Sequence, residues 1–204
     1  MRHGAVSAGR RTRARAARNA WRRGEILRSA GRVLQERGLA GVTMEHVAER
    51  LGLTKGSLYY YFEDKEDLLY QCHLQATAAS LEALRRARPS LPPDGRLREV
   101  LMGHIRGITG EEHGAIMLTD LETIAPARRR RIVAMRDRFE RGVRDIIREG
   151  IETGVFARVD VRLAGFAILG AINWIPKWYD PRGPLSPDEV AAQMAGLMVG
   201  ALRR

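Results

Sequence analysis

The segment from Val42 to Leu69, VTMEHVAERLGLTKGSLYYYFEDKEDLL, constrains the fold more than any other part of the chain. Thr43, Thr54 and Asp64 each stand just before a run with helical spacing of apolar residues, and all three are residue types favoured at helix N-caps. Gly52 separates the first two runs, where a tight turn needs a small residue. The pattern predicts two short helices joined by a turn and then a longer helix, which is the outline of a helix-turn-helix.

The side chains of this segment divide into an inward set and an outward set. The inward set is small or apolar and comprises Val42, Val47, Ala48, Leu51, Gly52, Leu53, Leu58 and Phe62. The outward set on the second helix is Thr54, Lys55, Gly56, Ser57, Tyr59, Tyr60 and Tyr61. Hydroxyl groups and a lysine can bind bases and phosphates, and the glycine allows a close approach of the backbone to DNA. An aromatic core patch is the alternative for Phe62 and for part of Tyr61, but three consecutive tyrosines cannot all face inward at about 100° per residue.

The charge of the chain supports a polyanionic partner. The 204 residues carry a net charge of +11, which favours nucleic acid or an anionic membrane surface. The excess is concentrated at the start of the chain, where no acid precedes Glu25. The arginines of that segment are Arg2, Arg10, Arg11, Arg13, Arg15, Arg18, Arg22 and Arg23. Residues 1–20 show no apolar periodicity, so we expect a flexible basic arm that is either a solvated tail or a binder of DNA phosphates or the minor groove; an organelle transit peptide has a similar composition.

Several classes of protein are disfavoured by the sequence. The single cysteine, Cys72, excludes an internal disulfide and a cysteine-based zinc site, and it fits a reducing, cytoplasmic location. No secretory signal is present, and the longest nearly apolar run, Leu163–Ile175, is too short to cross a membrane, which takes about 20 residues. No nucleophile–base motif, phosphate loop or metal-ligand spacing occurs. We therefore expect no enzyme, catalytic residue, cofactor, metal or membrane partner.

The rest of the chain reads as helices without a convincing strand, so the expected fold class is all-α. Besides the helices of the opening segment, apolar spacing predicts helices over about 21–37, 65–88, 96–108, 112–123, 127–153, 160–178 and 187–202. Gly38 should stop the first of these, and Ser186 with Glu189 should form a capping box for the last. The helix opened by Asp160 is apolar nearly all round, which predicts burial on every side, and Pro176 should bend or end it.

A family resemblance rests on the same opening segment. TMEHVAERLGLTKGSLYYYFEDKEDLL closely resembles the DNA-binding domain of the tetracycline-repressor (TetR) family of bacterial regulators, over about residues 22–70. The matching positions are Thr43, Val47, Ala48, Gly52, Gly56, Leu58, Tyr59, Phe62, Lys65 and Leu68. The resemblance implies about nine helices per chain and a homodimer on a near-palindromic operator. It also implies a helix-turn-helix domain over residues 21–66 and an effector-binding and dimerisation domain over residues 67–204.

The resemblance assigns the DNA contacts residue by residue. Base contacts fall at or near Lys55, Gly56, Ser57, Tyr59 and Tyr60, with Thr54 beside them. Phosphate contacts fall at Thr43, Tyr61 and Lys65. Met44 and Glu45 also lie near DNA in this pattern, although a carboxylate is unfavourable beside phosphate unless it accepts from a cytosine amino group.

The resemblance also implies that the last two helices form the dimer interface. The expected interface residues are Val190, Met194, Leu197, Met198 and Ala201, with Ala191, Ala195, Gly196 and Gly200 giving close approach. Simple core packing is the alternative for some of them. Two largely apolar terminal helices exceed what one small domain can cover. A two-fold dimer would place its two DNA-recognition helices about 34–36 Å apart.

A ligand pocket is expected in the larger domain. Candidate lining residues are Met102, Ile105, Met117, Leu121, Phe139, Val143, Asn173, Trp174 and Trp178, with Tyr179 and Lys177 near the last of these. Trp174 and Trp178 can line a cavity or fill core and interface, and both readings stay open. Polar contacts could come from His104, His113, Asp120 and Glu122, although solvent-facing or core-satisfied groups are the simpler reading. Arg128 to Arg131 are expected to form a solvated face.

The segment NWIPKWYDPRGPLSPDEVA is similar to TetR-family regulators of fatty-acid and sterol degradation, whose effectors are acyl-CoA thioesters. The resulting expectation is a repressor that a small hydrophobic ligand, such as an acyl-CoA, releases from DNA. Its ligand signal would enter the reader through the helix that begins at Lys65. The alternatives are a different hydrophobic effector, as in multidrug regulators, or a DNA-binding protein without an effector.

Overall fold

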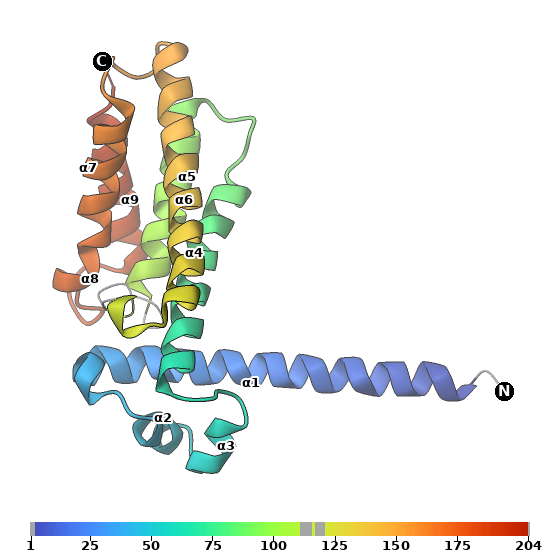
Figure 1. The fold of residues 1–204 in the computed structure, drawn as a ribbon. Coiled ribbons are helices and arrows are strands. Elements are labelled where there is room, and N and C mark those ends of the chain that lie inside the picture. Colours follow the sequence, from blue (N-terminus) through green and yellow to red (C-terminus); the bar gives the residue numbers. More distant parts are fainter. Residues whose placement is uncertain (1–2, 111–115, 117–120, 204) are drawn as a thin grey trace.

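The protein is described by a computed structural model that covers residues 3–110, 116 and 121–203, with side chains from Ala14 onward. A small domain, called the reader below, is formed by α1 (His3–Gly41), α2 (Met44–Arg50) and α3 (Lys55–Tyr59). It lies at one end of a bundle (Figure 1) whose helices are α4 (Lys65–Arg86), α5 (Pro93–Thr109), α6 (Pro126–Glu152), α7 (Val161–Asn173), α8 (Ile175–Trp178) and α9 (Pro187–Gly200). Within the described residues the extended pairing is limited to one isolated bridge between Phe156 and Arg203. The all-α prediction is confirmed.

Three of the predicted helix starts are confirmed by their cap hydrogen bonds. The Thr43 hydroxyl accepts from the backbone N–H of His46 at 3.2 Å. Thr54 accepts from Ser57 N–H at 3.2 Å, and the Asp64 carboxylate accepts from Asp67 N–H at 2.7 Å. These caps satisfy N–H groups that the first turn of a helix leaves without a backbone partner. They fix where α2, α3 and α4 begin.

The first helix is much longer than predicted. Its expected start at Trp21 is wrong, because α1 is helical from His3 (Figure 1). The added segment is rich in alanine and arginine, which are among the strongest helix formers, whereas apolar periodicity reports packing rather than helix formation. Gly38, with φ of 67°, interrupts the regular helix at the predicted stop. No side chain other than hydrogen adopts that conformation readily.

The small domain is built around one core that α4 shares. Val47, Leu58 and Phe62 are at most 1% exposed and pack with Ile26 of α1. The first turns of α4 belong to the same core through Leu68, Leu69, Cys72 and Ala76. Further along, Leu81 and Leu84 of α4 pack against the separate core of the bundle. No break in packing therefore falls at the expected boundary after residue 66, and one helix joins both cores.

The helix opened by Asp160 ends close to Pro176, as expected: it divides at Trp174 into α7 and α8, and Pro176 lies in the first turn of α8, where its missing N–H costs nothing. The expectation about its burial is corrected. Burial on every side is wrong, since Leu163 is 67% exposed and Phe166 is 49% exposed. An apolar sequence indicates that a helix is shielded from water, but it does not show whether the residues that shield it belong to the same chain or to a partner.

The C-terminal helix begins with the predicted capping box. Ser186 accepts from Glu189 N–H, and the Glu189 carboxylate accepts from Ser186 N–H at 2.8 Å. The predicted helix over residues 112–123 falls mainly outside the described residues, and its end, Leu121–Thr123, is a 3-10 turn. Within the described part of the chain, no helix combines the length and the apolar character needed to cross a membrane.

Candidate DNA-binding surface and its link to the bundle

The second helix of the helix-turn-helix, α3, presents polar and aromatic side chains to solvent. Tyr60 is 65% exposed and Tyr59 is 43% exposed, while Leu58 of the same helix is fully buried. Lys55 and Gly56 are also exposed, and Ser57 is half-buried. The helix therefore turns its predicted base-contacting residues outward and is held to the domain by Leu58. The contacts with bases stay a prediction.

The predicted phosphate contacts have different surroundings. The Thr43 oxygen accepts the cap hydrogen bond, and its O–H donates to the Glu45 carboxylate, so a contact with phosphate would have to replace that second bond. Tyr61 is half-buried against the reader core, with its ring edge-on to Tyr60 at 5.0 Å. The Lys65 ammonium donates to the backbone carbonyl of Leu39 at 2.9 Å. Lys65 thus joins the start of α4 to the end of α1, a role that the sequence did not suggest because the two residues are far apart in the chain.

Glu45 forms an ion pair with Lys55 that connects α2 to the face of α3. Hydrogen bonding to Glu45 raises the pKa of Lys55, and the same contact lowers the pKa of Glu45. The Lys55 ammonium also lies 5.8 Å from the centre of the Tyr59 ring. Met44, which the resemblance placed near DNA, is 4% exposed and belongs to the core. The carboxylate of Glu45 is therefore the α2 group that meets the lysine of the recognition surface.

Arg128 of α6 ties the bundle to the start of α4. Its guanidinium lies 3.2 Å from Glu63, 3.6 Å from Glu66 and 3.7 Å from Asp67. The same group lies over the Tyr70 ring at 5.3 Å, and the Glu66 carboxylate accepts from Ala125 N–H at 3.0 Å. The expectation that Arg128 belongs to a solvated arginine face is wrong. A charge run in the sequence does not show which of its members meets distant acids.

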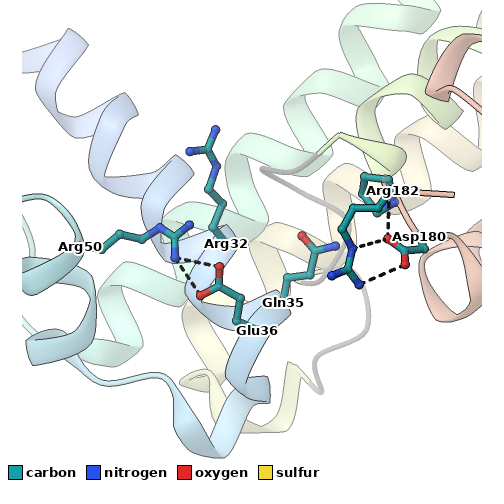
Figure 2. Close-up of a pocket in the computed structure, with 7 residues that line it drawn as sticks. Arg32, Gln35, Glu36, Arg50, Asp180 and Arg182 are labelled. Carbon is teal, nitrogen blue, oxygen red and sulfur yellow. Dashed lines mark hydrogen bonds and ion pairs between the residues drawn. The ribbon is translucent and has the colours of Figure 1, made fainter.

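A polar cleft of about 440 Å³ separates the reader from the loop between α8 and α9 (Figure 2). One wall carries Arg50, which donates to the Glu36 carboxylate at 2.8 Å. The other wall carries Arg182, which donates to Asp180 at 3.1 Å. The bundle thus contacts the start of α4 through Arg128 on α6, whereas a cleft separates the reader from the loop before α9.

Inside the bundle, a buried histidine connects three helices. The Nδ1 of His104 on α5 lies 2.8 Å from the hydroxyl of Ser80 on α4, and its Nε2 lies 3.3 Å from Asn173 at the end of α7. The His104 ring also contacts Phe139 of α6, with the centroids 4.7 Å apart. Burial lowers the pKa of His104 to about 4, against the opposing effect of the Asn173 hydrogen bond. His104 is therefore neutral near pH 7 and joins α4, α5 and α7 through hydrogen bonds.

The candidate pocket residues occupy different surroundings. Ile105, Phe139 and Val143 are buried in the bundle core, and Met102 packs against it. Leu121 packs beside Tyr70 and Ile132, away from that core. Trp174 and Trp178 are 62% and 51% exposed, so they do not line the interior of this protomer. Met117, His113 and Asp120 lie outside the described residues, and Glu122 is exposed.

The candidate interface residues on α9 also divide. Val190 is 1% exposed and belongs to the protomer core, together with Ala191 and Ala195, so its assignment to an interface is corrected. Leu197 is 64% exposed, and Ala201 is exposed too. Met194 and Met198 are half-buried. These five positions lie on one face of a helix with 3.6 residues per turn, so their burial differs along the helix axis: Val190 is covered within the protomer, whereas Leu197 and Ala201 are open to solvent.

Comparison with known proteins gives the family. Residues 26–72 match the model for bacterial regulatory proteins of the tetR family, and residues 90–202 match the model for a tetracyclin repressor-like C-terminal domain. The chain is 28% identical over 190 residues to the HTH-type transcriptional repressor KstR2 of Mycobacterium tuberculosis, covering 90% of this chain and 94% of that protein.

Two solved structures have the same architecture. The TetR family regulator PfmR of Thermus thermophilus is 35% identical with a TM-score of 0.78, covering 88% of this chain and 99% of that one. AibR, solved with isovaleryl coenzyme A and operator DNA, is 28% identical with a TM-score of 0.74, covering 87% and 96%. The first family match covers residues of the reader and the start of α4, and the second covers most of the bundle. The protein therefore belongs to the TetR family of bacterial regulators, and it is a DNA-binding transcriptional repressor of that family rather than an enzyme.

Proposed function

We propose that this repressor acts in the cytoplasm as a homodimer on a near-palindromic operator and that a small hydrophobic ligand releases it. An acyl-CoA thioester is the first candidate ligand. The observation that carries the proposal is that α4 belongs to both hydrophobic cores. A ligand that displaces the bundle end of α4 would move the reader end as well.

Exposed apolar side chains support the homodimer. Leu163 and Phe166 on α7 and Leu197 on α9 are each about half exposed or more. Figure 1 shows both helices at one edge of the bundle, where α7 packs on α6 and α9 packs on α5. Large apolar groups exposed to water are characteristic of a surface that another protein covers. A second copy of the same chain gives a closed two-fold arrangement, which a palindromic operator requires.

A polar connection in the bundle supports a ligand site. Ser80 and His104 are buried among apolar side chains, and the exposed Asn173 bonds to His104 from the end of α7. Ligand sites use a few such polar groups to orient a mostly apolar molecule. Ile105, Phe139 and Val143 fill the space beside His104. A ligand entering there would have to push helices apart, and that displacement would supply the conformational change.

Arg128 offers the route from the ligand to the reader. It is paired with Glu63, in the segment between α3 and α4, and with Glu66 and Asp67 in the first turn of α4. If helix movement in the bundle shifts α6 relative to α4, this cluster changes with it. Ligand binding can bias the two states only by its difference in affinity for them, so the two arrangements of this junction must differ in ligand affinity.

The choice of acyl-CoA rests on the similarity to AibR, whose structure contains isovaleryl coenzyme A, and on the resemblance of the segment from Asn173 to Ala191 to lipid-degradation regulators. The test starts with an operator selected from randomised duplexes. Fluorescence anisotropy then follows its release by isovaleryl-CoA and by a long-chain acyl-CoA. Free CoA and the free acids serve as controls.

We expect an acyl-CoA to lower operator affinity at least tenfold while free CoA has no effect. Release by an apolar drug-like compound and by no acyl-CoA would make the protein a regulator of the multidrug type. A chain that binds operator and responds to neither class would be an effector-independent repressor.

A further inference from the structure

The N-terminal half of α1 carries an arginine stripe, defined here as Arg15, Arg18 and Arg22. These positions continue at spacings of three and four residues into Ile26, Ser29 and Val33. Residues with this spacing lie on one face of an α-helix. Ile26, Ser29 and Val33 are at most 5% exposed. The arginine stripe is therefore the outward continuation of the face by which α1 packs on the reader.

The segment that carries this stripe projects from the protein. Figure 1 shows α1 running past α3 and away from the rest of the molecule. Arg15 and Arg18 are exposed, and no ion pair holds them within the described part of the chain. From Ala14 to Glu25 the helix spans roughly 18 Å at about 1.5 Å per residue. The reader is thus extended by a basic rod.

Contacts at the base of the rod fix its direction. The Arg23 guanidinium lies 4.8 Å from the centre of the Phe62 ring, just after α3, and Arg22 donates to Glu25 within α1 itself at 2.7 Å. Phe62 is 1% exposed in the reader core. The helix therefore leaves the reader with a defined orientation, and its arginine stripe faces the side on which the reader lies.

We propose that the arginine stripe binds backbone phosphates of the DNA duplex next to the half-site that α3 reads. This inference rests on the proposed operator binding. An α-helix with side chains is about 10–12 Å wide, whereas the minor groove of B-DNA is about 6 Å wide. A helical segment cannot enter that groove, so the rod lies along the backbone and does not insert into the minor groove. Its contribution is independent of sequence, because phosphates are alike at every base pair.

A membrane surface is the other polyanion that a basic helix can bind. Membrane-surface helices bury an apolar face rich in large side chains. Between Ala14 and Arg23 the uncharged positions are alanines, one asparagine and Trp21. This composition provides cationic groups with little apolar area, which favours the DNA backbone.

The test uses the full-length protein with R15A and R18A combined. Alanine preserves the helix, since it is the strongest helix former. The measurement is the slope of log K against log salt on a duplex with the selected operator and ten added base pairs on each side. A dimer that loses two phosphate contacts per chain should show a slope about 3 to 4 less negative. The matched control is R141A with R158A, which removes two exposed charges from the bundle and should leave the slope unchanged.

Two further measurements separate the outcomes. Removing the added flanks should abolish the difference between the wild type and R15A/R18A. A17P keeps every arginine but breaks the helix within the rod, so it should reproduce most of the loss. An unchanged slope in R15A/R18A, with operator binding intact, overturns the inference alone. Full activity of A17P would show a flexible arm and would also overturn it, as would anionic vesicles binding the wild type more tightly than DNA does. Absence of any operator binding by the wild type would instead overturn the proposed function.

Discussion

Glu45 on α2 and Lys55 on α3 form an ion pair at the surface where the reader has to meet DNA. Both side chains are 54% exposed, so the pair itself contributes little to folding stability. Its carboxylate nevertheless lies next to the lysine predicted to contact bases, and it would repel phosphates. DNA binding must therefore either accommodate or break this pair.

Replacing Glu45 with Gln should strengthen DNA binding. The variant removes a negative charge and leaves Lys55 available to DNA, so we expect a three- to tenfold gain in affinity at low salt, with a smaller gain at high salt because screening weakens exposed charges. Filter binding or anisotropy on the selected operator measures it. E49Q removes a similar exposed charge later on α2 and serves as the control. Equal affinities of E45Q and the wild type would show that the pair does not limit binding.

Arg128→Gln should loosen the junction between α6 and α4. We expect a small loss of unfolding free energy, since the Asp67 partner is buried but Arg128 and Glu63 are reached by solvent. Operator affinity without ligand should change little, but the ratio of affinities with and without ligand should fall several-fold. Chemical denaturation and ligand titrations provide both values. R130Q, which alters an exposed neighbour, should behave like the wild type; if R128Q keeps the full ligand response, the signal takes another route.

The apolar face of α7 and α9 should control assembly. Leu163→Glu combined with Leu197→Glu places charges where a partner would pack, so the chain should become monomeric and lose at least a hundredfold in operator affinity. Val133→Glu, at a residue that is 41% exposed on α6, is the matched control and should leave the mass unchanged. Light scattering after gel filtration reports the mass. A wild type that is monomeric at micromolar concentration would remove the basis for this interface.

Stability should fall as pH drops from 7 to 5 because His104 is buried neutral. Burial lowers the pKa of His104 in the folded state to about 4, below its ordinary value of 6.5. The unfolded chain then binds a proton that the folded chain does not, so stability is complete above the unfolded pKa and is lost as pH falls toward the folded one. This difference amounts to about 2 kcal/mol between pH 7 and pH 5.

Urea denaturation at the two pH values compares the wild type with H104Q, whose side chain does not titrate. The pH-dependent loss should be smaller in H104Q. His73, whose pKa burial also lowers to about 4, keeps its own contribution in both proteins. An identical pH dependence in the two would contradict the assignment.

Local signals predicted the reader well. Thr43, Thr54 and Asp64 act as caps, and Leu58 and Phe62 are buried, because capping and helix spacing depend on residues a few positions apart. The helical start of α1 was missed because its alanines and arginines favour a helix without packing it. That segment shows that the absence of an amphipathic pattern does not predict the absence of a helix.

Contacts between residues far apart in the chain could not be predicted from the sequence. The contact of Lys65 with the Leu39 carbonyl, the Glu45–Lys55 pair and the position of Arg128 all depend on how helices pack. Val190 and Leu197 have equally apolar side chains on one helix, yet one is 1% exposed and the other 64%. The two residues lie seven positions apart, on nearly the same side of α9, so what separates core from surface is which part of the helix the rest of the bundle covers.

The most direct test of the central claim is the mass of the protein–operator complex, measured by native mass spectrometry with and without an acyl-CoA. Without ligand we expect two chains on each operator duplex. With ligand we expect free duplex and a ligand-bound dimer. A single chain on the operator, or a complex that persists while the dimer carries bound acyl-CoA, would contradict the account of a dimeric repressor released by its ligand.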